Sequence, residues 1–87
     1  MNIFTSELLG TAVLVGAVLL TGNPVLIALG FFIAILISNI SGGHINPIVT
    51  MIKYIQGAIS QQEAFNYLAG QILGGLIAYF LVKHFLG

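Results

Sequence analysis

An unbroken apolar run from residue 8 to residue 20 constrains the fold of this 87-residue chain more than any other feature. Extended back to Ile3, the run reaches the roughly 20 residues that cross a bilayer core of about 30 Å. Hydrophobic residues make up 59% of the chain and charged residues only 5%, which leaves too little polar surface to solvate a folded globule in water. The sequence therefore predicts an integral membrane protein.

The charge and cysteine content exclude several classes of function. The chain has no cysteine and a formal net charge of zero, so it has no disulfide, thiolate metal site or catalytic thiol. Its only lysines are Lys53 and Lys83, and it has no arginine, whereas a phosphate backbone is bound by clustered basic residues. We therefore expect the lipid bilayer of a cell (inner) membrane as its surroundings, no nucleic acid as a partner, and no cofactor or metal.

Turn and capping signals divide the chain into helices. Asn23 and Pro24 are typical of a helix start directly after a short turn, so the first two helices should be antiparallel neighbours. The helical pattern that begins at Pro47 is only about ten residues long, or about 15 Å, half a membrane. Ser60 and Glu63 form a capping box that opens the last helix. We predict a single all-α membrane domain, 1–87, with three transmembrane helices at 3–21, 24–40 and 61–86 and a re-entrant loop and half-helix at 41–56.

The segment before the half-helix carries its most unusual chemistry. Asn46 caps free amides, Pro47 has no N–H to leave unpaired, and the positive end of the helix dipole points back along the loop. At mid-membrane such a start must be enclosed in protein or lie beside a watery cavity. Gly42 and Gly43 would let an extended strand with exposed carbonyls enter there. The same residues also fit a surface loop followed by a short interfacial helix, and local chemistry leaves both interpretations open.

A family resemblance bears on that choice. The residues Ser-Gly-Gly-His-Ile-Asn-Pro-Ile-Val-Thr, 41–50, resemble the first Asn-Pro-Ala box of the aquaporin and glycerol-facilitator (major intrinsic protein) family, with Ile48 in place of the family's Ala. Glu7 with Thr11 is similar to the Glu-x-x-x-Thr of the family's first span, and the stretch 67–71 with Gly74 is similar to its third. The resemblance covers nearly the whole chain, but only the first half of a family member.

The resemblance implies a passive channel for water and small neutral solutes such as glycerol. In the family, two inverted halves each send a half-helix to the membrane centre, where two Asn side chains hold the solute. It implies that Asn46 is the solute donor, that Pro47 starts the half-helix, and that carbonyls around Gly42, Gly43 and His44 line the path. Because this chain supplies one half-helix, we expect an inverted homodimer, assembled further into a higher homo-oligomer.

Glu7 has three interpretations. An ionisable residue in a span is a functional candidate, so Glu7 could couple transport to protons; it could also lie solvated near the membrane surface. The resemblance implies a third role, a buried acceptor for the amides of the loop in a network with Thr11 and Gln71, which fits the cost of unpaired amides in lipid. His44 is expected to fix the loop by hydrogen bonding and not to bind metal, because His84, the only other histidine, lies at the far end of the chain.

The resemblance also predicts the two mouths of the pore. The family's filter combines an Arg that follows the second Asn-Pro-Ala with aromatic or His side chains from the second and fifth spans. Here Val49 follows the motif, and counting back from Asn46 without gaps gives Leu26 and Ala34. Together with Gly43, these residues would make each mouth uncharged and apolar. We expect poor discrimination among small neutral solutes.

Two other functions remain as alternatives, and an enzyme is not expected because no nucleophile, base and orienting group occur together. One is a small dual-topology, proton-coupled exporter that uses Glu7, although such exporters have four full spans and no Asn-Pro half-helix. The other is a half-channel that pairs with a separate second-half chain. With one lysine expected on each side of the membrane, the positive-inside rule gives almost no orientation signal, so we expect dual topology.

Overall fold

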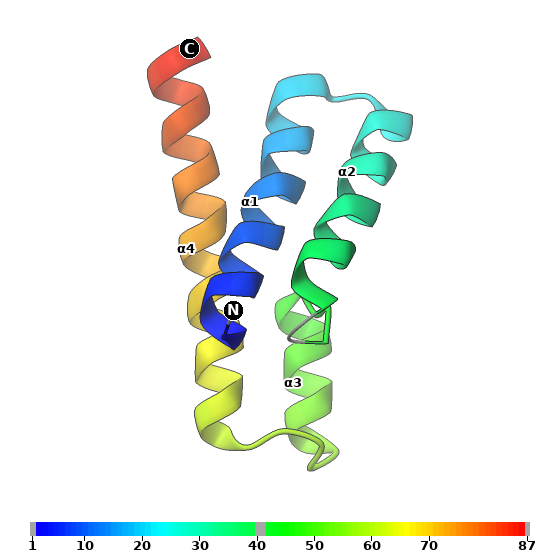
Figure 1. Cartoon of the computed structure of the whole chain (residues 1–87), viewed down its shortest axis with the longest axis vertical. Coiled ribbons are helices and arrows are strands. Elements are labelled where there is room, and N and C mark those ends of the chain that lie inside the picture. Colours follow the sequence, from blue (N-terminus) through cyan, green and yellow to red (C-terminus); the bar gives the residue numbers. More distant parts are fainter. Residues whose placement is uncertain (1, 40–41, 87) are drawn as a thin grey trace.

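The computed structural model describes residues 2–39 and 42–86, and this part of the chain forms four α-helices and no strand (Figure 1). The predicted end of the second span, Ile40, and the first residue of the motif, Ser41, lie outside the described residues. The helices are α1 (Ile3–Thr21), α2 (Pro24–Ser38), α3 (Pro47–Ile55) and α4 (Gln61–Leu86).

Side-chain caps set the helix boundaries. The Oδ1 atom of Asn23 accepts hydrogen bonds from the N–H groups of Val25 and Leu26 at 2.9 and 3.1 Å, and Pro24 fills the first position of α2. At α4, Ser60 N–H donates to Glu63 Oε1 at 2.9 Å and Glu63 N–H donates to Ser60 Oγ at 3.1 Å. These are the cap and capping box that the sequence predicts, each satisfying amides that a helix start leaves without partners.

The helices pack around α1. It lies between α4 and α2 and contacts both, while α3 packs against α4 (Figure 1). The molecule measures 40 × 24 × 21 Å, and α3 follows α2 in the same direction along its longest axis (Figure 1). The loop between them lies near the level at which α1 begins. This arrangement brings the start of α3 beside the first turns of α1 and the middle of α4.

Two glycines of α4 permit its close contact with α1. A Cβ atom at Gly70 would lie 2.6 Å from the carbonyl oxygen of Phe4, and one at Gly74 would collide with the carbonyl oxygen of Leu8. Gly70 and Gly74 form a small-xxx-small pair of the kind that brings membrane helices together. In this fold the pair is used within the chain, on the α1–α4 contact.

The helix lengths and the surface fit a membrane protein, with one departure from the prediction. The 19 residues of α1 and the 26 of α4 are long and apolar enough to cross a bilayer. By contrast, α2 has 15 residues, which give about 22 Å against a core of about 30 Å. It ends at Ser38, before the predicted 40. Large apolar side chains are exposed on all four helices, among them Leu20, Val25, Ile55 and Phe85, as lipid contact requires.

Candidate functional site: the loop that starts the half-length helix

The loop before α3 has a backbone that few residues can adopt. Gly42 and Gly43 have positive φ values of 106° and 68°, and Ile45 has a φ of 38°. Positive φ is uncommon for any residue but Gly and is a genuine outlier for a β-branched one, with a cost of about 1–3 kcal/mol that surrounding contacts must offset. The Gly43 N–H donates to Ser38 O at 2.9 Å, which ties the loop to the end of α2.

Asn46 caps α3 and leaves its amide group available. Its Oδ1 atom accepts a hydrogen bond from Ile48 N–H at 2.8 Å, and its side chain is exposed. None of the described residues accepts a hydrogen bond from its Nδ2 group. Pro47 occupies the first position of the helix. The positive end of the α3 dipole and an amide donor therefore meet at one exposed point.

Glu7 joins the loop to two helices. Its side chain is fully buried, and its Oε1 atom accepts hydrogen bonds from Ile45 N–H at 2.7 Å and from Gln71 Nε2 at 3.0 Å. The first bond holds the backbone at the residue with unfavourable φ, which links α1, the loop and α4. Thr11 is also buried, but its Oγ1 atom has no hydrogen-bond partner among the described residues. Of the three residues predicted to support the loop, Glu7 and Gln71 are thus in direct contact and Thr11 makes no hydrogen bond to them.

Two further residues of this cluster were not among the predicted site residues. Thr50 is fully buried, and its Oγ1 atom lies 3.0 Å from both Gln71 Nε2 and His44 Nδ1. The ring of Tyr67 stacks on that of His44, with centroids 3.8 Å apart and planes 11° from parallel. Spacing could have pointed to both: Thr50 lies one helical turn after Asn46, and Tyr67 one turn before Gln71, so each shares a face with a predicted residue.

His44 is held on two sides by these contacts and is buried. The described residues contain no group of three or more His, Cys, Asp or Glu side chains that could hold a metal ion. The contacts of His44 with Thr50 and Tyr67, and of Ile45 with Glu7, hold the loop against the helices. Its members come from three helices and the loop, so the position of Asn46 depends on the packing of the whole chain.

The residues predicted to line the mouths have different environments. Leu26 is 48% exposed and Val49 is 39% exposed, whereas Ala34 is fully buried. Ala34 lies against α1, where its carbonyl oxygen is 3.0 Å from the place of a Cβ on Gly10. Gly43 is partly exposed. Leu26, Val49 and Gly43 thus have exposed surface, as residues that line a pore mouth would need, whereas Ala34 has none.

We expect Glu7→Gln to lower the free energy of unfolding by about 1 kcal/mol, the size of one hydrogen bond, and to keep most of the transport activity that the family resemblance implies. Glutamine keeps a carbonyl oxygen that can accept from Ile45 N–H, but it puts a second NH₂ group into the buried cluster beside Gln71. Thermal unfolding in detergent and solute flux in proteoliposomes measure the two effects. Glu63→Gln is the control, since Glu63 acts only in the capping box of α4. Loss of a proton-coupled flux in Glu7→Gln would contradict this supporting role.

The chain has helices with exposed apolar side chains and a polar cluster buried around a loop. These are features of an α-helical integral membrane protein. The sequence profile of the family described as Major intrinsic protein matches residues 22–87. This match covers more than half of the chain. The chain belongs to the major intrinsic protein family.

Curated relatives agree with this assignment. The chain is 37% identical over 95 residues to "Glycerol uptake facilitator protein-like 6" of Lactiplantibacillus plantarum, a match that covers 98% of this chain and 44% of the relative. It is 44% identical over 57 residues to "Probable aquaporin TIP1-2" of Oryza sativa subsp. japonica, covering 64% of the chain and 23% of the relative. "Aquaporin TIP1-1" of Arabidopsis thaliana is 40% identical over 57 residues.

The chain spans less than half the length of these relatives. No solved structure matches it.

Proposed function

We propose that this chain forms a passive channel for water and small neutral solutes such as glycerol. The observation that carries the proposal is Asn46, whose Oδ1 atom caps α3 while its amide group remains exposed at the positive end of the helix. A neutral solute with a hydroxyl or carbonyl oxygen can accept from that amide. A cation would meet the positive end of the dipole. Names of relatives that include glycerol uptake facilitator and aquaporin support this class of solute.

The pore requires a second half, and we propose that an inverted copy of the chain provides it. The 9 residues of α3 extend about 14 Å, half of a bilayer core of about 30 Å. A parallel partner would place both half-helices in the same leaflet. An inverted partner places one in each, with the two Asn46 side chains near the midplane and a two-fold axis in the membrane plane. Further assembly of such pairs into a higher homo-oligomer is part of this proposal.

In this arrangement the single domain 1–87 crosses the membrane three times. The helices α1 and α4 have the length for full crossings, and the short α2 relies on the loop and α3 to complete its passage in the same direction (Figure 1). The predicted re-entrant loop would then be an interruption within this crossing, with the start of α3 inside the membrane and its polar backbone beside the aqueous path, where it is tolerated. A cell (inner) membrane is the proposed location.

The environment of Glu7 favours a channel over a proton-coupled exporter. An exporting carboxylate must alternately face the two sides of the membrane, whereas Glu7 is fully buried and its Oε1 atom accepts from both Ile45 and Gln71. A pairing with a separate second-half chain is the other alternative. Purified chain that conducts alone in proteoliposomes would exclude this second alternative.

The test of the proposed function is a comparison of solute fluxes. We expect water, glycerol and urea all to pass, with negligible ion current, because Leu26 and Val49 provide an apolar rim and the chain has no arginine for a charged filter. Ion exclusion would rest on the α3 dipoles and on the cost of dehydration at the rim. Light-scattering assays on proteoliposomes and conductance across a planar bilayer measure these quantities. Strict passage of water alone would show that the mouth residues are wrongly assigned.

A further inference from the structure

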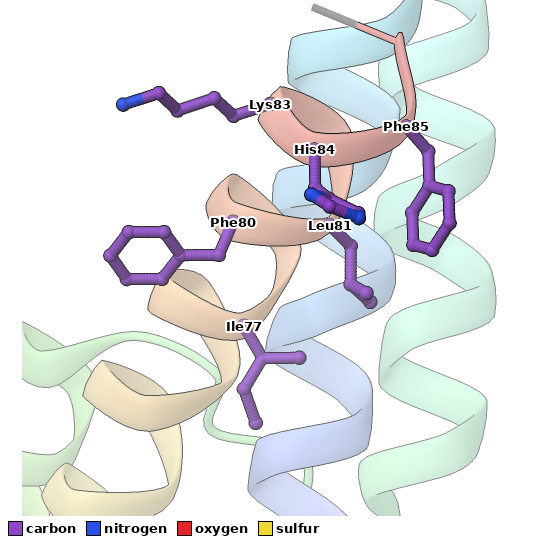
Figure 2. Close-up of a pocket in the computed structure, with 6 residues that line it drawn as sticks. All are labelled: Ile77, Phe80, Leu81, Lys83, His84 and Phe85. Carbon is purple, nitrogen blue, oxygen red and sulfur yellow. The ribbon is translucent and has the colours of Figure 1, made fainter.

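A groove at the C-terminal end of α4 lies away from the loop before α3. It has a volume of about 720 Å³ and is lined by four apolar and two basic side chains: Ile77, Phe80, Leu81, Lys83, His84 and Phe85 (Figure 2). Ile77, Phe80 and Leu81 precede the basic pair along the helix, and Phe85 follows it (Figure 2). We propose that this groove binds an anionic phospholipid, with an acyl chain along the apolar side chains and the phosphate at Lys83 and His84.

The expected position of the groove across the membrane fits such a lipid. The 26 residues of α4 extend about 39 Å, longer than a bilayer core of about 30 Å, so the last turn reaches the headgroup level. Lys83 and His84 are in this last turn and are exposed. Ile77 lies about two turns deeper, at the level of the acyl chains. The basic pair and the apolar residues that precede it, Ile77, Phe80 and Leu81, thus follow the same order as the headgroup and acyl chain of a phospholipid.

The charges at this end of the molecule favour an anionic headgroup. The only two acidic residues of the chain are Glu7 and Glu63; the first is buried in the loop cluster and the second begins α4 at its opposite end. Neither Lys83 nor His84 makes an ion pair with a described residue, and the nearest aromatic contact of the Lys83 Nζ atom is the Tyr79 ring, 5.9 Å away. The ammonium and imidazole donors remain available to a phosphate.

A second copy of the chain is the competing occupant of the groove. In an inverted pair, Glu63 of one copy lies at the membrane face that holds Lys83 of the other, so an ion pair between copies would use the same lysine. A lipid and a second copy predict different effects of removing the Lys83 side chain. A lipid site predicts that its removal changes lipid retention and leaves the dimer intact.

Native mass spectrometry in detergent tests the proposal, with phosphatidylglycerol and phosphatidylcholine of identical acyl chains supplied in equal amounts. A basic residue near an anionic lipid contributes about 1 kcal/mol, so we expect the chain to retain phosphatidylglycerol about fivefold more than phosphatidylcholine. Lys83→Gln with His84→Gln should remove this preference. Lys53→Gln is the matched control, since it removes the other lysine at the end of α3, and it should leave the preference unchanged.

Other outcomes would overturn the lipid site. Equal retention of both lipids by the unaltered chain, or an equal loss of preference in Lys53→Gln, would show only a general attraction of charge. Competition by sodium phosphate at the lipid's concentration would show that the acyl groove contributes nothing. Dissociation of the dimer in the Lys83→Gln, His84→Gln variant with unchanged lipid retention would assign the groove to the second copy.

Discussion

Asn46→Leu is expected to reduce water and glycerol flux about thirtyfold at unchanged protein content in the membrane. A hydrogen bond to a passing solute contributes about 1 kcal/mol, and the proposed pore of two copies would lose two of them, which together correspond to about a thirtyfold change. Leucine also puts an apolar side chain in place of the exposed amide at the start of α3. Osmotic shrinking and swelling of proteoliposomes measures both fluxes, and flux equal to that of the unaltered chain would remove Asn46 from the pore.

The chain contains its own control for the loss of a helix cap. Asn23 caps α2 as Asn46 caps α3, each followed by proline and each accepting through Oδ1. Replacement of either cap should cost about 1 kcal/mol of stability, so Asn23→Leu should resemble Asn46→Leu in thermal unfolding and keep its flux. A fall in flux of the same size in Asn23→Leu would mean that capping, and not solute contact, explains the effect.

A second variant separates the two functions of the Asn46 side chain. Asn46→Asp keeps an oxygen that can accept from Ile48 N–H and removes the amide donor. We therefore expect near-normal stability with a low flux of neutral solutes. Stability and flux that both remain normal would show that no donor is needed at this position.

The helices of the chain could be predicted from sequence because their ends carry local chemistry. Asn23 with Pro24, Asn46 with Pro47, and Ser60 with Glu63 each satisfy amides within four residues, so the information for these starts lies next to them. The end of α2 was less predictable. Asn39 and Ile40, which follow Ser38, carry no strong stop signal, and the glycine-rich loop beyond them follows a path that depends on contacts with α1 and α4.

The supporting cluster shows where sequence reasoning reached its limit. The resemblance identified Glu7 and Gln71, which the structure brings into contact, but the hydroxyl beside Gln71 and His44 belongs to Thr50 and not to Thr11. Thr11 lies on α1 and Thr50 on α3, and only the packing of these two helices against α4 decides which hydroxyl contacts Gln71. The burial of Ala34 likewise depends on the close approach of α2 to α1 at Gly10. Such details arise from packing between helices and are not encoded in local spacing.

Dual topology would have the largest consequence for the organisation of the proposed channel. The turn between α1 and α2 and the end of α4 lie at one end of the molecule, and the connection from α3 to α4 lies at the other (Figure 1). Lys83 is thus at one end and Lys53 is near the other. Because orientation follows the difference in Lys and Arg between the two sides, one lysine per end gives no preference, and both orientations should be populated.

Added lysines should convert this balance into fixed orientations. Gln61→Lys with Gln62→Lys adds charge at the Lys53 end, and Thr21→Lys with Leu86→Lys adds it at the Lys83 end; all four positions are exposed. We expect each variant alone to lose nearly all flux, because inverted pairs cannot form. Expression of both variants together should restore the flux.

The most direct measurement of the inverted pair is the orientation of the unaltered chain itself. A reporter that is active only inside the cell and one that is active only outside should be fused, separately, to the N-terminus and to the C-terminus. The inverted homodimer predicts that each terminus gives substantial activity with both reporters, in similar amounts. A single fixed orientation of every molecule, with each terminus active with only one reporter, would contradict a pore made of two inverted copies.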